Sequence, residues 1–172
     1  LNKSSTQEFL NDANGKRRLL QKELKSADFL FLTFGTSIAF EWHKTKKVVN
    51  NCHRQPSADF SKVMLSEERM TAKMAAAIEK IKSVNPHIEI ILTVSPIRHL
   101  RHGAVQNQRS KARLIKLCEN LEAAFPNCTY LPIYELVMDE LRDYRFYRQD
   151  DLIHLNMGGL AVIKDRFMTS MI

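Results

Sequence analysis

The sequence predicts an α/β fold built on a parallel sheet, because strand-like and helix-like patterns alternate along the chain. The three expected strands, residues 27–34, 87–94 and 129–133, lack polar alternation, as strands covered on both faces do. Amphipathic helical patterns lie between them, which favours right-handed crossovers within one sheet. The 172 residues, 44% of them hydrophobic, suffice for one sizeable core. We therefore expect a single domain over residues 1–172.

The first third of the chain is expected to begin with a polar helix over residues 14–26, which leads into the strand 27–34. This strand ends at Gly35. The segment 41–62 has few apolar residues and predicts a long polar excursion after the carboxyl end of the strand. Proteins of the α/β class build their sites in such excursions.

The helix expected at residues 66–84 carries its own start and stop signals. Ser66 is a candidate N-cap directly before two glutamates, and the pair Asn85-Pro86 ends the pattern. Beyond it we expect the strand 87–94, a helix over 108–124, the strand 129–133, a helix over 134–144 and a last helix from about Asn156. Pro132 lies inside the third strand, which favours a position at the edge of the sheet.

The charge of the chain is positive, with 26 lysines and arginines against 19 acidic residues and a net charge of +7. This balance favours anionic partners such as acidic sugars or phosphate groups, whereas a basic solvated surface explains it equally well. A nucleic acid partner is not expected, because the basic and aromatic residues near the C-terminus fit an ion-paired helix end better. No stretch of 18 apolar residues is present, so the sequence predicts no transmembrane helix and no membrane partner.

Cys52, Cys118 and Cys128 are odd in number and show no C-x-x-C spacing, so they predict neither a disulfide framework nor a zinc site. We expect a reducing compartment, hence a cytoplasmic location, and neither a metal nor another cofactor. The chain opens at Leu1 without a methionine, and we expect it to be part of something longer.

Ligands of parallel α/β sheets bind outside the carboxyl ends of the strands. At those ends the sequence places Gly35-Thr36 after the first strand, and Ser95 and the pair Arg98-His99 after the second. An arginine in this position can clamp a carboxylate or phosphate. Four basic residues farther along are instead expected to be solvated, namely Arg101, His102, Lys111 and Arg113.

The sharpest chemical signal is Asp151-x-x-His154, in the loop before the last helix. A carboxylate three residues before a histidine can hold its Nδ1–H and leave Nε2 free as a general base. The alternative interpretation is that Asp151 caps a turn and His154 bonds to the backbone. Asn51 and His53 form a second polar patch, in which an asparagine could donate to an oxyanion and a histidine could bind substrate.

Five segments, taken in order, resemble the GSCFA domain family, a bacterial branch similar to the SGNH (GDSL-like) hydrolases. The residues that carry the resemblance are Thr33-Phe34-Gly35-Thr36, Val48-Val49-Asn50-Asn51-Cys52-His53, Thr93-Val94-Ser95-Pro96-Ile97-Arg98-His99, Asn107-Gln108-Arg109-Ser110-Lys111-Ala112 and Asp143-Tyr144-Arg145-Phe146-Tyr147. The resemblance implies a flavodoxin-like, three-layer α/β/α domain and ester or acyl-group chemistry. It makes Asp151 and His154 the acid and base of a Ser-His-Asp triad, with a small-molecule or carbohydrate ester as substrate.

Two departures from the family pattern matter. The Gly-Ser-Cys-Phe-Ala motif with its presumed nucleophile is absent, so we expect the nucleophile on a segment upstream of Leu1. That segment, or a partner strand, is expected to cover the edge of the strand 28–34, since apolar edges recruit other strands. Gly35-Thr36-Ser37 also lacks the Asn of a G-x-N-D block, so Asn51 would have to substitute for it beside Gly35, or the oxyanion hole is built otherwise.

The resemblance therefore favours a serine esterase or acyl hydrolase whose substrate contacts include Arg98 or His99. A non-catalytic module that binds an acidic ligand is the alternative function, and it rests on the charge of +7 and the Arg98-His99 pair.

Overall fold

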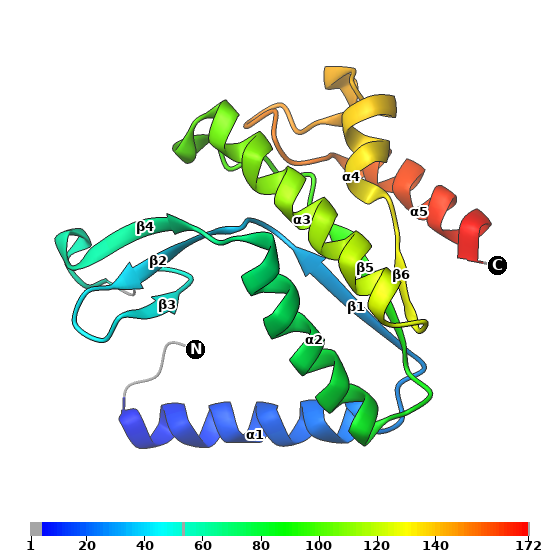
Figure 1. Ribbon diagram of the computed structural model, residues 1–172. Coiled ribbons are helices and arrows are strands. Elements are labelled where there is room, and N and C mark those ends of the chain that lie inside the picture. The colour runs from blue at the N-terminus through cyan, green and yellow to red at the C-terminus, as the bar shows by residue number, and fades with distance from the viewer. Residues whose placement is uncertain (1–4, 53, 172) are drawn as a thin grey trace.

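The computed structural model describes residues 5–52 and 54–171 and has a mixed α/β fold (Figure 1). A three-stranded parallel sheet forms the centre of the molecule, and a small antiparallel sheet lies beside it. The helices are α1 (Thr6–Leu24), α2 (Glu67–Val84), α3 (Ala104–Ala124), α4 (Ile133–Glu135) and α5 (Met157–Met171). The strands are β1 (Phe29–Phe34), β2 (Ile38–Trp42), β3 (Lys47–Val49), β4 (Phe60–Met64), β5 (Glu89–Val94) and β6 (Cys128–Tyr130).

The parallel sheet has the strand order β1-β5-β6, so β5 is its central strand. Ile90 to Val94 in β5 are all buried, which confirms a strand covered on both faces. In β1 the exposure instead alternates, and Phe29 and Phe31 are 55% and 49% exposed. The expectation that residues 27–34 are buried on both faces is therefore wrong, because β1 lies at an edge of the sheet and one of its faces is only partly covered.

The segment 41–62 is not the long loop that its composition indicates. Together with flanking residues it forms the antiparallel sheet, in the order β3-β2-β4. Trp42 of β2 stacks on Phe60 of β4 with ring centroids 6.2 Å apart. The strands are only three to five residues long, and the segments 43–46 and 50–59 that join them are polar, so the whole region has the composition of a loop.

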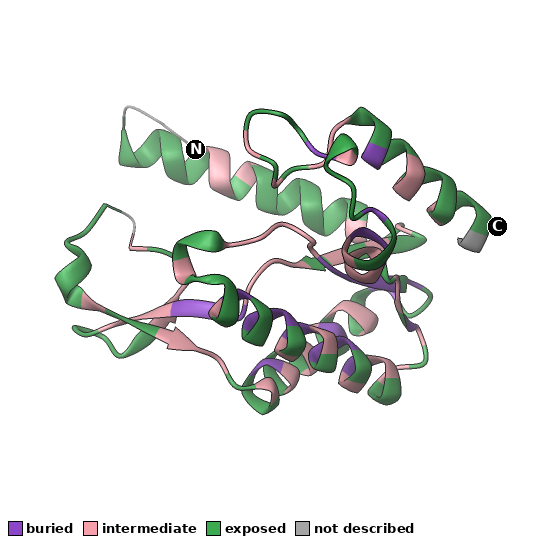
Figure 2. Cartoon of the chain, turned by 90° about the horizontal axis from the view of Figure 1, so that it is seen from above, coloured by how far each residue is buried: buried purple, intermediate pink, exposed green. Residues whose placement is uncertain are grey.

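The predicted helix at residues 66–84 is confirmed as α2, and the Ser66 hydroxyl accepts a hydrogen bond from the Arg69 backbone at 3.3 Å. At the other end of α2, the buried Asn85 side chain donates to the carbonyls of Leu24 (3.0 Å) and Ala27 (2.8 Å). These bonds attach the last turn of α1, most of which lies exposed along one side of the molecule (Figure 2). Asn85 thus both terminates one helix and fixes the end of another.

The other predicted helices differ from the structure mainly at their ends. α1 and α3 begin earlier than expected, and the predicted helix 134–144 is a short α4 followed by a π-helical turn, Leu136–Glu140. α5 begins where expected, because the Asn156 side-chain oxygen accepts the Gly159 amide at 3.1 Å. β6 is shorter than residues 129–133 but lies at the sheet edge, as Pro132 predicts.

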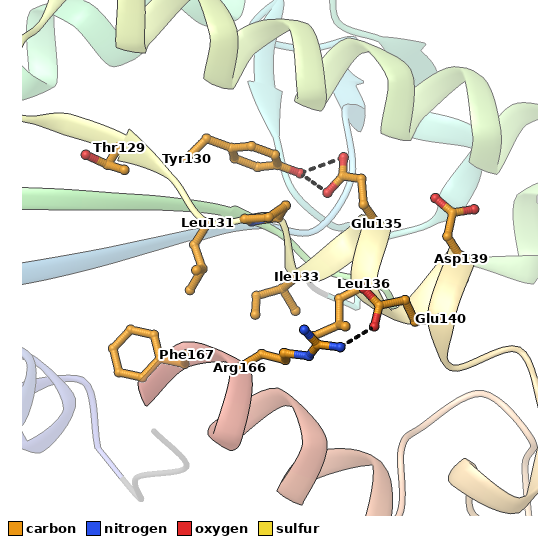
Figure 3. A pocket seen from close by; sticks show the side chains of 11 residues that line it. Thr129, Tyr130, Leu131, Ile133, Glu135, Leu136, Asp139, Glu140, Arg166 and Phe167 are labelled. Atoms are coloured by element: carbon orange, nitrogen blue, oxygen red, sulfur yellow. Dashed lines mark hydrogen bonds and ion pairs between the residues drawn. The ribbon is translucent and has the colours of Figure 1, made fainter. Parts of the chain in front are cut away.

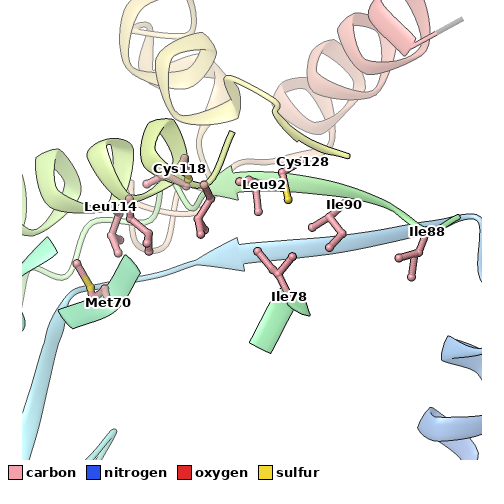
Figure 4. Packing of buried hydrophobic residues seen from close by; sticks show 11 residues of the cluster. Met70, Ile78, Ile88, Ile90, Leu92, Leu114, Cys118 and Cys128 are labelled. Carbon is pink, nitrogen blue, oxygen red and sulfur yellow. The ribbon is translucent and has the colours of Figure 1, made fainter. Parts of the chain in front are cut away.

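The main core lies between the sheet and the helices α2 and α3 (Figure 4). Ile78 from α2 and Leu114 and Cys118 from α3 meet Ile90 and Leu92 of β5 there, and each is at most 2% exposed. On the opposite face of the sheet α5 packs, with the rings of Phe31 and Phe167 5.7 Å apart. Within residues 5–52 and 54–171, no helix has the length and apolar character needed to cross a bilayer.

Candidate functional site

The loop before α5 brings Asp151 and His154 into direct contact, as their spacing predicts. Asp151 Oδ2 lies 2.7 Å from His154 Nδ1. Asp151 Oδ1 accepts the backbone N–H groups of His154 at 2.9 Å and Ile153 at 2.8 Å. These two backbone bonds, and then the bond from the imidazole, lower the pKa of Asp151 to about 2. The carboxylate therefore stays ionised near neutral pH and holds Nδ1, which leaves Nε2 as the ring nitrogen that can take up a proton.

The backbone around this pair is itself held in place. The Arg148 amide donates to the His154 carbonyl at 2.8 Å, and Tyr147 forms an isolated bridge with Leu155. The Asn156 side chain donates to the Tyr147 carbonyl at 3.1 Å. The pair thus sits on a constrained loop, while the His154 side chain remains 53% exposed.

Lys111 of α3 links the exits of two parallel strands. Its side chain is only 1% exposed, and its Nζ donates to the carbonyls of Gly35 at 2.7 Å and Ser95 at 2.5 Å. Burial lowers the pKa of Lys111 to about 8. The expectation that Lys111 is solvated is wrong. The signal was present in the sequence, since Lys111 precedes Leu114 and Cys118 by three and seven residues and so shares their buried helix face.

Ser110 and Asn107, also on α3, form further hydrogen bonds to the segments that follow β1 and β5. The Ser110 hydroxyl accepts the Ser37 amide at 2.7 Å and lies 3.0 Å from the Thr36 hydroxyl. The Asn107 side-chain oxygen accepts the His99 amide at 2.9 Å. Sequence reasoning did not select either residue, although both lie in the segment Asn107 to Ala112 that carries part of the family resemblance.

Four of the predicted site residues, Gly35, Thr36, Ser95 and His99, are brought together at the carboxyl edge by these contacts with α3. His99 lies directly beside Gly35, since a Cβ added to Gly35 would be 3.8 Å from His99 Nε2. Burial, followed by the positive charge of Lys111, lowers the pKa of His99. Its imidazole is accordingly neutral at physiological pH.

Arg98 is not a free guanidinium. Its Cζ lies 5.5 Å from the ring centroid of Tyr147, which is a cation–π distance. The segment after β5 is therefore packed against the loop that carries Asp151 and His154. Arg113 is also engaged, as it donates to the carbonyls of Met64 and Leu65, so the expectation of a solvated Arg113 is wrong as well.

Asn51 is exposed in the chain that leaves β3. The pairing of Val49 with Phe40 directs that chain back toward the start of β2. Its part in an oxyanion hole stays a prediction. His53 lies outside the described residues.

In the described part of the chain, a cavity of about 440 Å³ at the carboxyl ends of the strands includes Ser95 and is lined on its other side by α5. Two further cavities adjoin the same edge of the sheet. One, of about 450 Å³, lies between β6, α4 and α5 and contains none of the predicted site residues (Figure 3). In it the Tyr130 hydroxyl donates to the Glu135 carboxylate at 2.8 Å, and Arg166 pairs with Glu140 at 3.0 Å. The other, of about 660 Å³, borders Gly35 and Thr36. Among the residues that the structure describes, no group of three or more His, Cys, Asp or Glu side chains could hold a metal ion.

The GSCFA family model matches residues 1–167 of the chain. No curated protein matches it.

Proposed function

Since the chain belongs to the GSCFA family, we propose that it provides the acid–base part of a serine hydrolase of the SGNH type. The substrate of this enzyme is an ester or acyl group on a small molecule or carbohydrate. The observation that carries the proposal is the Asp151–His154 contact of 2.7 Å, on a loop packed against the carboxyl edge of a parallel sheet. A flavodoxin-like, three-layer arrangement of the complete domain is part of the same proposal.

In this mechanism His154 Nε2 removes the proton from a serine hydroxyl as its oxygen attacks the substrate carbonyl carbon. Asp151 keeps the imidazole in one tautomer and stabilises the imidazolium that forms. The imidazolium then returns the proton to the leaving oxygen, and an acyl-enzyme results. A water molecule, deprotonated by the same nitrogen, releases the acid and regenerates the serine.

The nucleophile in this proposal comes from a segment outside residues 1–172. Ser37 is 1% exposed and donates its hydroxyl to Ser110, so a substrate could not reach it. The Ser95 hydroxyl accepts the Ile97 amide at 3.3 Å and follows the central strand, not the outer one. In the described residues β1 pairs with β5 alone, and a strand on its other edge would deliver a serine next to Gly35.

The oxyanion would be stabilised by the Gly35 amide, with Thr36 and Asn51 as further polar groups. Lys111 fixes this turn by donating to the backbone carbonyls of Gly35 and Ser95, which holds the two strand exits together. His99 would contact the substrate as a neutral ring, whereas Arg98 would position the Tyr147 loop.

The test is reaction of the intact protein with a fluorophosphonate probe, which labels activated serines. We expect labelling in the wild type and a loss of at least about 100-fold in the labelling rate in His154→Ala. His87→Ala, an exposed histidine just before β5, is the matched control and should label normally. Absence of labelling in the wild type would refute the hydrolase and favour the non-catalytic binding module.

A further inference from the structure

The larger cavity opens at the carboxyl end of β1, between the turn that joins β2 to β3 and the first half of α2. Its volume of about 660 Å³ lies within the usual range of small-molecule pockets. Gly35 and Thr36 form one wall, so the cavity borders the turn that Lys111 and Ser110 hold in place. A ligand bound here would lie beside the candidate active site.

The ionisable side chains that line this cavity are all basic. Lys46 and Lys47 come from the β2–β3 turn, and Arg69 and Lys73 come from α2. No carboxylate contributes to the described lining, and Lys46 has only a 3.9 Å contact with Glu41. Arg69 and Lys73 are spaced four residues apart on one helix, a like-charge arrangement that disfavours the helix by itself. An anion between the turn and α2 would relieve this repulsion.

The β2–β3 turn, which carries Lys46 and Lys47, has a strained backbone. Lys46 has a φ of 57°, in the left-handed region that a lysine rarely adopts. Its amide donates to the Trp42 carbonyl at 2.7 Å, which closes the turn. The tight turn presents two successive lysines at the mouth of the cavity.

The inner surface of the cavity is apolar. Met70, Leu114 and Leu117 are nearly buried, and Leu65 and Met74 are half-buried in front of them. Methionine side chains adapt to ligands of irregular shape because they are unbranched and flexible. A basic rim above an apolar floor matches a molecule with an anionic head group and a hydrocarbon body.

We propose that this cavity binds a single-chain amphiphilic anion, with its carboxylate or phosphate head between the β2–β3 turn and α2 and its chain on the methionine and leucine floor. The binding step is independent of catalysis. Its identification as the substrate site rests on the proposed hydrolase function, and it would then make the substrate an anionic acyl compound.

The experiment is isothermal titration of the intact protein with decanoate, with decyl phosphate and with uncharged decyl maltoside, each below its micellar concentration. We expect saturable binding of at least one anionic probe and clearly weaker binding of the maltoside. A preference between the two anionic probes identifies the head group. The double variant Lys47→Glu/Lys73→Glu should weaken anion binding about tenfold or more.

The matched control is Lys22→Glu/Lys80→Glu, which changes the net charge equally at exposed sites of α1 and α2 outside this cavity. It should bind like the wild type. Met74→Trp, with all four basic residues retained, should also weaken binding by filling the floor. The proposal is overturned by absence of saturable binding, by equal binding of the maltoside, or by equal losses in the two double variants.

The cavity and the hydrolase can fail separately. Anion binding by a protein that a fluorophosphonate does not label would keep the cavity and remove the hydrolase. Labelling without anion binding would keep the hydrolase and remove the anion-binding proposal. It would then favour a polypeptide segment as the occupant of the cavity.

Discussion

Three hydrogen bonds converge on the carboxylate of Asp151 and hold its pKa at about 2, although the side chain is partly exposed. An aspartate in the unfolded chain has a pKa of about 3.9. Because the folded-state pKa is the lower one, these bonds stabilise the fold fully above about pH 4, and the contribution is lost as the pH falls to about 2.

The variant Asp151→Asn should therefore have a lower Tm than the wild type at pH 7, and the difference should shrink to nearly zero by about pH 2. Thermal unfolding measured by circular dichroism across this range checks the prediction. Asp165→Asn, at an exposed site in α5, is the control. A constant difference in Tm between Asp151→Asn and the wild type would contradict the role of these hydrogen bonds.

Lys111 affects its neighbour His99 through its charge. Burial and then the Lys111 ammonium lower the pKa of His99. The variant Lys111→Met removes that charge, so we expect the pKa of His99 to rise, while Lys111→Arg should leave it low. Titration of the imidazole resonances by NMR measures both values. An unchanged His99 pKa in Lys111→Met would show that burial alone sets it.

The same residue shows what sequence reasoning missed at this scale. Asp151 and His154 could be paired from sequence because three residues of a tight loop bring the groups together. The role of Lys111 depends on which face of α3 meets the sheet and on carbonyl groups 76 and 16 residues away. A lysine in an apolar stripe is the one local sign of such an arrangement, and the general preference of lysines for solvent outweighs that sign in the sequence.

Two glycines in helices should respond to alanine in opposite ways. Gly15 in α1 has no atom within 4 Å of an added Cβ, whereas a Cβ at Gly159 in α5 would lie 2.8 Å from the Phe146 carbonyl oxygen. Gly15→Ala should stabilise the protein by up to about 1 kcal/mol, because alanine favours the helix. Gly159→Ala should destabilise it by about 1–3 kcal/mol, because α5 must move away from the loop before it.

Urea denaturation gives both free energies of unfolding. The backbone resonances of residues 144–156 should shift in Gly159→Ala and stay unchanged in Gly15→Ala, because Gly159 lies against the Phe146 carbonyl and Gly15 has no atom within 4 Å of an added Cβ. A neutral Gly159→Ala would mean that α5 is not held as closely as the Phe146 contact requires.

At the level of elements, the sequence was most informative where one pattern dominated. β5 and α2 follow from an uninterrupted apolar run and from a capped amphipathic helix. The antiparallel sheet could not be predicted from the sequence, because its strands are short and are stabilised by pairing with one another. The π-helical turn after α4 also has no local signature, since its Leu141 to Leu136 bond depends on how the turn packs.

The whole chain exposes more surface than its size requires. Its accessible area is 11535 Å², whereas a folded monomer of this mass exposes about 8,700 Å². The excess of roughly 2,800 Å² is comparable to a large protein interface. Exposed apolar side chains contribute to it on α1, where Leu19 and Leu20 are about 60% exposed, and on β1 at Phe29 and Phe31.

We therefore expect another polypeptide segment to cover β1 in the intact protein. Hydrogen exchange measured by NMR should show slow exchange for all amides from Phe29 to Phe34 if a strand pairs with the free edge. Fast exchange at every second amide would indicate that this edge is bare. The amides of the central strand β5 provide the internal reference for full protection.

The placement of the antiparallel sheet has a kinetic consequence. β1 and β5 pair residues that are 60 positions apart, as in the Thr33–Thr93 hydrogen bond, so bringing them together from the unfolded chain closes a long loop. Much of that loop is itself structured, because β2 pairs with β4 and the Leu65 amide donates to the Ser37 carbonyl at 2.9 Å. Once β2, β3 and β4 have paired, fewer disordered residues separate β1 from β5, so the entropy cost of closing the loop is smaller. Early formation of this small sheet would thus set the rate at which the parallel sheet assembles.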